Sequence, residues 1–278
     1  LNVIVSKSGN RIETIVNSNI IIKKNDKAIF ITENTKNYLY SIAEKMKSEI
    51  IHHNNFIGGR YSVLSEVGML PAELMGLKTD EFKQFNSLIK NKNFLNSLVK
   101  SVNATLYFIK NKKFNSIIIN YDEKSENLFK WYQQLVAESL GKSSKGVLPI
   151  ISDMPKDNHS LMQLYLDGNK NCFFTFFDVI DANSPKIKNK ILDNFKYLKG
   201  HSLQSIKLAQ KKATQIVFKS KKIPFRSFEI LKKNEETLGE LFTFFMLETI
   251  LLGKMMKINP FDQPAVELIK KETKKILV

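Results

Sequence analysis

The segment Ser116-Ile117-Ile118-Ile119-Asn120 decides the fold. Successive side chains of an extended chain point to opposite sides, so three consecutive isoleucines make both faces apolar. Strands that are apolar on both faces are typical of parallel sheets covered by helices. The segment therefore predicts a central strand of an α/β protein.

Short apolar runs alternate with amphipathic stretches along the rest of the chain. This order is typical of βαβ units, so we expect doubly wound, mostly parallel sheets in three α/β/α layers. Further strands are predicted at Val3–Val5, Ala28–Thr32, Val147–Ile151, Phe173–Val179 and Pro224–Ile230. Helices are predicted at Thr35–Lys47, Glu126–Leu140, Leu203–Lys219 and Thr237–Met256. Gly76–Asp80 interrupts the pattern and predicts a boundary.

The formal net charge of +16 over 278 residues raises the question of a nucleic-acid partner. Single-strand binders alternate basic residues with aromatic ones, and no basic run here does so. A composition rich in lysine along the whole chain is the better explanation, and we expect no nucleic acid. The positive field would still attract anionic substrates such as sugar phosphates.

The cysteine count and the apolar runs indicate the redox compartment and whether a segment could span a membrane. Cys172 is the only cysteine, so no internal disulfide forms and a reducing compartment, the cytoplasm, is expected. The run Leu241–Met256 contains Glu248 and Lys254, which favours a buried helix over a membrane span. The chain opens without Met on the apolar run Leu1–Val5, which resembles a strand cut out of a longer chain.

Ser6-Lys7-Ser8-Gly9-Asn10-Arg11 follows the first predicted strand. Hydroxyls and a glycine before a helix gather backbone N–H groups at its N-terminus, an arrangement that favours a phosphate. Ser6 and Ser8 can add O–H donors, and Lys7 or Arg11 can add positive charge. An ordinary serine N-cap explains the same pattern equally well.

Two further segments carry polar groups in fixed positions. Gly58-Gly59-Arg60-Tyr61-Ser62 allows close backbone approach beside a guanidinium that could stabilise an oxyanion, although a tight turn beside a surface arginine also fits. Gln134 and Glu138 lie four residues apart on one helical face, in a helix that is predicted to end near Gly141. Taken alone, Glu138 is more simply a solvated surface carboxylate than a general base.

The last two segments contain a histidine and a lysine. His159, in Asp157-Asn158-His159-Ser160, could transfer protons near neutral pH or merely begin a helix. Lys270 follows Gln263 by two helical turns after a proline-punctuated loop. His52, His53 and His201 form no metal-ligand spacing with Cys172, and we assign no metal.

In this order, the segments resemble the phosphoglucose isomerase family. Gly58-Gly59-Arg60-Tyr61-Ser62 looks like its Gly-Gly-Arg-Tyr/Phe-Ser signature, and Glu138-Ser139-Leu140-Gly141-Lys142 like its Glu-Ser-x-Gly-Lys segment. Phe261 to Lys270 is similar to its C-terminal Phe-Asp-Gln-x-Gly-Val-Glu-x-x-Lys signature, and Ser6 to Thr14 to its phosphate turn. Four matches in family order are far more specific than any one of them.

The resemblance implies isomerisation of glucose 6-phosphate and fructose 6-phosphate through an enediol(ate), without a cofactor. It implies Glu138 as the base, Arg60 as the group that stabilises the anion, and Lys270 at the ring oxygen. His159 would act in ring opening from the partner subunit of a homodimer. Ser6, Lys7, Ser8 and Arg11 would hold the phosphate, and Gln134 and Gln263 would contact the sugar.

The resemblance also implies two sugar-isomerase domains. Residues 1–76 would be the remaining part of the first domain, and residues 77–278 the second domain with a C-terminal helix. Four positions depart from the family: Arg11 replaces a threonine, Glu66 a small residue, Ala265 a glycine and Thr249 a histidine. The family's glycine-rich loop would precede Leu1. A non-catalytic sugar-phosphate-binding domain remains the alternative function.

Overall fold

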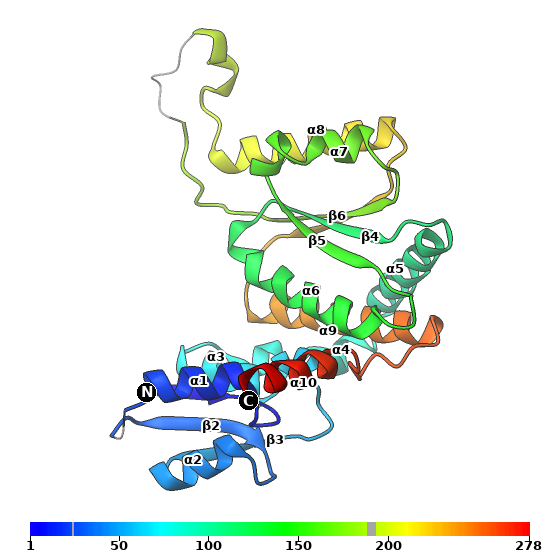
Figure 1. Ribbon diagram of the computed structural model, residues 1–278. Coiled ribbons are helices and arrows are strands. Elements are labelled where there is room, and N and C mark those ends of the chain that lie inside the picture. Colours follow the sequence, from blue (N-terminus) through cyan, green and yellow to red (C-terminus); the bar gives the residue numbers. More distant parts are fainter. Residues whose placement is uncertain (24, 188–192) are drawn as a thin grey trace.

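The computed structural model describes residues 1–23, 25–187 and 193–278, which form two parallel sheets (Figure 1). The first sheet has the strand order β1-β2-β3, with strands β1 (Asn2–Val5), β2 (Ala28–Glu33) and β3 (Glu49–His53). Helices α1 (Ile12–Ile21) and α2 (Tyr38–Met46) cover its opposite faces.

The second sheet has the order β5-β4-β6-β7 and places the isoleucine-rich segment in its interior. Its strands are β4 (Asn115–Asn120), β5 (Leu148–Asp153), β6 (Cys172–Val179) and β7 (Phe225–Ile230). Ile118 packs into a core with α5 (Lys92–Lys110), α6 (Glu126–Leu140) and α9 (Glu235–Met255). Ile117 and Ile119 pack oppositely, with α7 (Met162–Asp167) and α8 (Leu203–Ser220). The expected doubly wound α/β class is confirmed.

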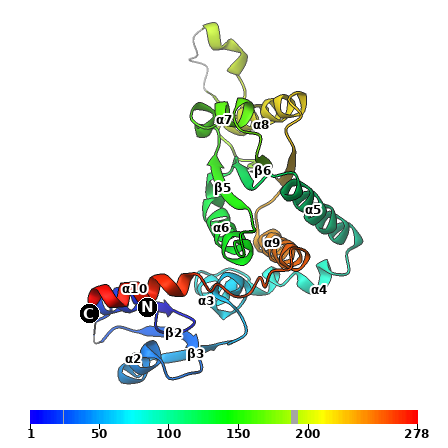
Figure 2. The same ribbon diagram turned by 45° about the vertical axis from the view of Figure 1, so that its right-hand side comes forward.

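Short helices connect the two sheets and close the chain. After β3 come η1 (Gly59–Leu64), α3 (Glu66–Leu74), η2 (Thr79–Phe82) and α4 (Phe85–Leu88). Three short turns follow strands or loops of the second sheet: η3 (Glu123–Ser125), η4 (Lys156–His159) and η5 (Asp193–Leu198). The last helix, α10 (Val266–Leu277), returns to the first sheet and lies beside α1 in both views (Figures 1 and 2).

Helix α9 is the buried helix predicted for the apolar run near the C-terminus. Gly239 permits its close approach to η2, because a Cβ there would lie 2.2 Å from the backbone oxygen of Phe82. Glu248 is 2% exposed and pairs with Arg226 on β7. Among the described residues, no helix is both long and apolar enough to cross a bilayer.

Candidate active site

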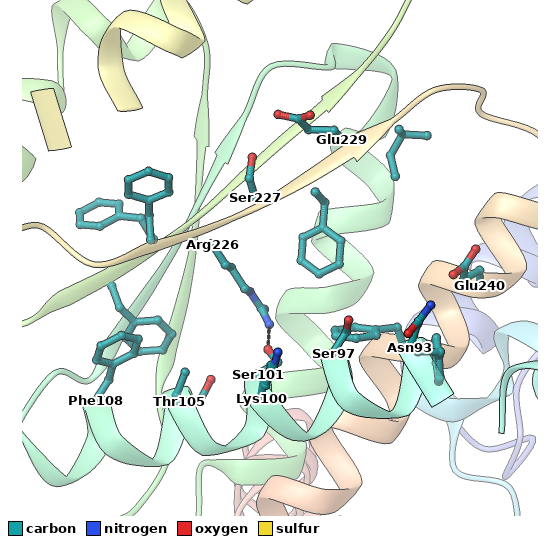
Figure 3. Close-up of a pocket in the computed structure, with 18 of the residues that line it drawn as sticks. Asn93, Ser97, Lys100, Ser101, Thr105, Phe108, Arg226, Ser227, Glu229 and Glu240 are labelled. Carbon is teal, nitrogen blue, oxygen red and sulfur yellow. Dashed lines mark hydrogen bonds between the residues drawn. The ribbon is translucent and has the colours of Figure 1, made fainter. Parts of the chain in front are cut away.

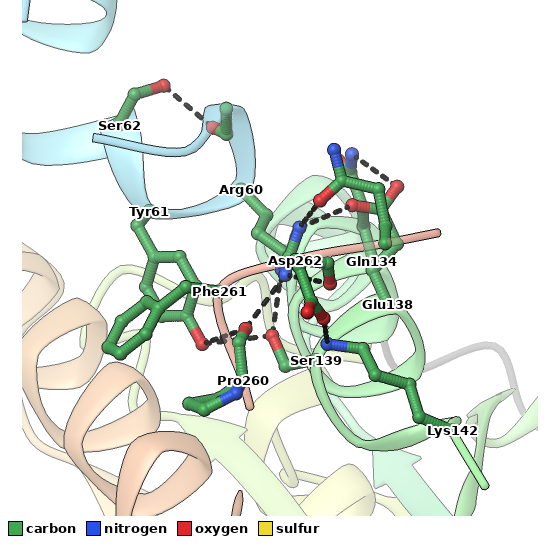
Figure 4. Close-up of polar contacts among 12 residues, drawn as sticks. Arg60, Tyr61, Ser62, Gln134, Glu138, Ser139, Lys142, Pro260, Phe261 and Asp262 are labelled. Atoms are coloured by element: carbon green, nitrogen blue, oxygen red, sulfur yellow. Dashed lines mark hydrogen bonds and ion pairs between the residues drawn. The ribbon is translucent and has the colours of Figure 1, made fainter. Parts of the chain in front are cut away.

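Arg60 is the centre of the site. It is the second residue of η1, directly after Gly58 and Gly59, and is 2% exposed, yet all five of its N–H groups donate hydrogen bonds (Figure 4). Nε donates to Ser139 Oγ (2.8 Å), Nη1 to Glu138 Oε2 (3.2 Å) and Gln263 Oε1 (2.7 Å), and Nη2 to the backbone oxygens of Pro260 (2.7 Å) and Asp262 (3.0 Å). One guanidinium thus joins three segments that are far apart in the sequence.

Glu138 occupies the last turn of α6, which ends at Leu140 with Gly141 as its C-cap. Its side chain is 31% exposed, so the carboxylate is reachable although Arg60 holds it. Gln134, one helical turn earlier, donates from Nε2 to Glu138 Oε1 at 3.1 Å. Both carboxylate oxygens are therefore oriented by donors, and the shared helical face predicted for Gln134 and Glu138 is confirmed.

The loop Asn259–Gln263 is fixed from both sides. Lys142 donates to Asp262 Oδ1 at 2.7 Å and also contacts the backbone oxygen of Asn259. Tyr61 OH donates to the backbone oxygen of Pro260 at 3.2 Å. The hydrogen bond from Lys142 lowers the pKa of Asp262 below its ordinary value. These contacts hold Gln263 against Arg60.

A cavity of about 620 Å³ opens beside this loop. Glu138, Lys142, Lys257 and Gln263 line it, so the proposed base faces a space of ligand size. Sequence reasoning assigned no role to Lys142 or Lys257. Lys142 stood in the quoted Glu-Ser-x-Gly-Lys segment, and its position in that motif was the available signal.

The predicted phosphate turn lies at the carboxyl edge of the first sheet. Ser6 is 4% exposed, and its Oγ has no hydrogen-bond partner within the described part of the chain. Gly9 has φ +63° and packs on Asn37, whose side chain a Cβ would overlap. The turn leads directly into α1, and Arg11 stands exposed at the N-cap without a side-chain cap.

Lys7 points away from this turn toward neighbouring segments. Its Nζ lies 3.3 Å from Glu33 Oε1 and donates to the backbone oxygen of Asn55 at 2.7 Å. Ser8 is exposed, and its Oγ accepts from the Asn10 N–H at 3.5 Å. The turn is therefore tied to the Asn54–Ile57 loop that precedes Arg60.

His159 does not join the Arg60 cluster. Helix α6 runs antiparallel to β4 and β5, so Glu138 lies near the amino edge of the second sheet, whereas η4 follows the carboxyl end of β5. Six residues of strand separate these edges by about 20 Å. His159 is exposed there, and Lys270 is exposed on α10.

The family departures differ in how the surrounding structure accommodates them. Ala265 has φ −66° and ψ −29°, which any residue adopts, so this backbone requires no glycine. Thr249 is 1% exposed, and its Oγ1 has no partner among the residues described. Glu66 contacts His53 Nδ1.

A second and larger cavity, of about 720 Å³, lies between α5, β7 and α9 (Figure 3). Its lining combines phenylalanines with polar and charged side chains, and Arg226 crosses it to hydrogen-bond with Ser101. None of the site residues predicted from the sequence lines it. Its size alone therefore does not make it the active site.

Comparisons with known proteins agree with the motifs. The model of the family described as phosphoglucose isomerase matches residues 1–278. The glucose-6-phosphate isomerase of Methanocaldococcus jannaschii is 31% identical over 96% of this chain and 69% of its own length. That of Mycoplasmopsis pulmonis is 36% identical over 88% of this chain and 60% of its own length. This chain thus spans about three fifths to two thirds of these curated relatives.

Solved structures share the fold. A protein described as hypothetical from Thermus thermophilus superposes with a TM-score of 0.90 at 24% identity, covering 99% of this chain and 71% of that one. A glucose-6-phosphate isomerase from Chlamydia trachomatis gives a TM-score of 0.75 at 18% identity, covering 99% and 58%. Because the family model matches the whole sequence and a relative exceeds 30% identity over most of both chains, the chain belongs to the phosphoglucose isomerase family, which confirms the resemblance of its motifs.

Proposed function

We propose that this protein interconverts glucose 6-phosphate and fructose 6-phosphate by moving a proton between C1 and C2 of the open-chain sugar. The observation that carries the proposal is the bond from Arg60 Nη1 to the reachable carboxylate of Glu138. Membership of the phosphoglucose isomerase family supports the same reaction. The chemistry requires a positioned base and a stabiliser of negative charge.

Glu138 would take the proton from the sugar carbon. Donors from Gln134 and Arg60 fix both oxygens, so the carboxylate loses little orientational entropy when it meets substrate. The developing enediolate needs a cation nearby. Nη2 of Arg60 is committed to backbone oxygens, whereas Nη1 is bonded to the side chains of Glu138 and Gln263. The Nη1 edge is therefore the one that could turn to the enediolate.

The phosphate would lie at the turn Ser6–Ser8. A buried hydroxyl without a partner costs free energy unless a ligand satisfies it, and Ser6 Oγ is such a group. The N-terminus of α1 adds backbone N–H groups, and Arg11 adds charge at its N-cap. Lys7 already bonds to Glu33 and Asn55, so we assign it a supporting contact.

We infer further that the active unit is a homodimer. His159 lies at the sheet edge opposite Glu138, which fits a residue that serves the site of another subunit. Lys270 on α10 would approach the ring oxygen. Mixing Glu138→Gln chains with His159→Ala chains should restore part of the turnover through hybrid dimers. Absence of recovery after verified subunit exchange would show that His159 acts within its own chain or does not act.

A non-catalytic sugar-phosphate-binding domain is the second candidate. It would use the phosphate turn without needing Arg60 and Glu138 to meet, so their contact favours the enzyme. The deciding experiment measures fructose 6-phosphate binding by calorimetry and its conversion to glucose 6-phosphate in one preparation. Binding with conversion supports the isomerase. Binding without conversion, in this chain and in a version extended upstream, supports the binding domain.

A further inference from the structure

The segment between β3 and Arg60 is held by contacts that the proposed chemistry does not use. β3 ends at His53, and the turn Asn54–Ile57 leads into Gly58-Gly59 and η1. Within this turn, the Ile57 N–H donates to the Asn54 oxygen at 3.1 Å. The turn sets where η1 begins, so it also sets where the Arg60 guanidinium lies.

His53 is 2% exposed and faces two hydrogen-bond acceptors. Its Nε2 lies 3.0 Å from the backbone oxygen of Ile57, and its Nδ1 contacts Oε1 of Glu66. A neutral imidazole carries one N–H and can donate to only one of them. The ring thus links the Asn54–Ile57 turn to the first turn of α3.

Glu66 lies in the first turn of α3, where a carboxylate interacts favourably with the helix dipole. Partial burial works to raise its pKa, but hydrogen bonds from its own backbone N–H, His53 and the Asn54 N–H outweigh this and leave the pKa below its ordinary value. Glu33 is the register neighbour of His53 on β2, but its carboxylate pairs with Lys7. Glu66 is thus the carboxylate that faces the ring.

We propose that His53 and Glu66 are positioning residues, which clamp both ends of the Asn54–Ile57 turn and thereby hold Arg60 opposite Glu138. His53 fixes the Ile57 oxygen, and Glu66 fixes the Asn54 N–H. Lys7 grips the middle of the same turn through the Asn55 oxygen. Neither positioning residue touches the substrate, and their kinetic effect rests on the proposed function of Arg60.

The kinetic test compares His53→Gln and Glu66→Gln with two matched controls. His52→Gln changes the exposed neighbour on β3, and Glu73→Gln changes an exposed carboxylate on α3. We expect kcat to fall about tenfold in His53→Gln and Glu66→Gln, with KM within about twofold, because the guanidinium shifts while the phosphate turn stays intact. The controls should retain parental kcat and KM.

A second readout does not depend on turnover. In a nitrogen-15 NMR spectrum, the Arg60 Nε–H signal reports its bond to Ser139, and Arg60→Lys identifies that signal by removing it. The signal should shift or broaden in His53→Gln and Glu66→Gln but not in the controls. Absence of isomerase activity both in the parental chain and in a version extended upstream would refute the proposed function, while this signal would still decide the positioning role.

Two results would overturn the inference. An Arg60 signal in Glu66→Gln that equals the signal in Glu73→Gln would show that the pair does not position the guanidinium. In an active enzyme, unchanged kcat in both substitutions would show the same. If His53→Gln fails to fold, the milder Glu66→Gln, which keeps an oxygen acceptor for the ring, carries the test alone.

Discussion

Arg60 and Arg226 each pair with a carboxylate, but the two pairs are exposed in opposite ways. Arg60 is buried and Glu138 is 31% exposed, whereas Glu248 is 3% exposed and Arg226 is 26% exposed. Glu138 can therefore meet a substrate, and Glu248 can only meet its neighbours. The comparison supports the catalytic role proposed for the first pair and predicts a structural role for the second.

The surroundings of the two arginines follow the same division. Arg60 bonds to loop and helix-end groups beside a cavity of about 620 Å³. Arg226 on β7 bonds instead to Thr175 on β6 at 2.9 Å and to Glu248 on α9. Its partners are the core elements themselves, so removing one of them should affect the whole second sheet.

Glu248→Ala should produce the largest effect. It leaves the Arg226 cation without its buried partner, and breaking such a pair costs about 3–5 kcal/mol of unfolding free energy. Urea denaturation measures the loss. Glu240→Ala, at an exposed position of the same helix, is the matched control and should change stability far less. Equal losses in both variants would contradict the role assigned to Arg226–Glu248.

Glu138→Gln should show the opposite profile. Turnover should fall about a hundredfold or more, equivalent to about 2.7 kcal/mol, because an amide does not accept the proton. The free energy of unfolding should stay close to that of the parent, since the side chain remains part-exposed and can still accept from Arg60. Turnover near the parental value would remove Glu138 from the mechanism.

The buried phenol of Tyr132, near Arg226 and Glu248, should make the stability of the folded state sensitive to alkaline pH. Burial, followed by the nearby Glu248 charge, raises its pKa from 10.0 to about 12. The folded state thus favours the protonated phenol. The contribution of this group to the unfolding free energy is complete below pH 10 and is lost as pH rises toward 12. At pH 11 the loss is about 1.4 kcal/mol.

The Tyr132 prediction is measured as unfolding free energy against pH in the parent and in Tyr132→Phe. The difference between the two should shrink above pH 10, because phenylalanine has no proton to lose. A constant difference up to pH 12 would show that Tyr132 does not titrate in this way.

Sequence reasoning located the second sheet because its central strands, β4 and β6, are apolar on both faces. It missed β3, whose Glu49-Ile-Ile-His-His pattern mixes polar and apolar residues on an edge strand. It also missed α5, although Phe94, Leu98 and Val102 follow the four-residue spacing of one helical face. The domain division at residues 76 and 77 stays a prediction.

The motifs identified Arg60, Glu138 and Gln263 but not how they meet. Arg60 is 78 residues from Glu138 and 203 from Gln263, and no local pattern encodes a contact over that distance. No sequence pattern connects His53 with Glu66 either. The glutamate at position 66 is explained only by its contact with the His53 ring in the folded structure.

Ala265→Gly should have the smallest effect. It tests whether the loop that holds Arg60 keeps its conformation during turnover. The substitution restores the family's usual residue at the N-cap of α10. Glycine costs backbone entropy in a helical conformation, but it is also a better N-cap than alanine, and the two effects oppose each other. We expect the unfolding free energy to change by less than about 0.5 kcal/mol and kcat/KM by less than about twofold. The backbone at Ala265 is already helical, so the loop Asn259–Gln263 should keep its hydrogen bonds with Arg60.

A rise in kcat/KM beyond about fivefold would mean that the reacting site uses a backbone conformation at this position that only glycine reaches easily. The loop would then move during turnover, and the Arg60 contacts would describe only one of its states.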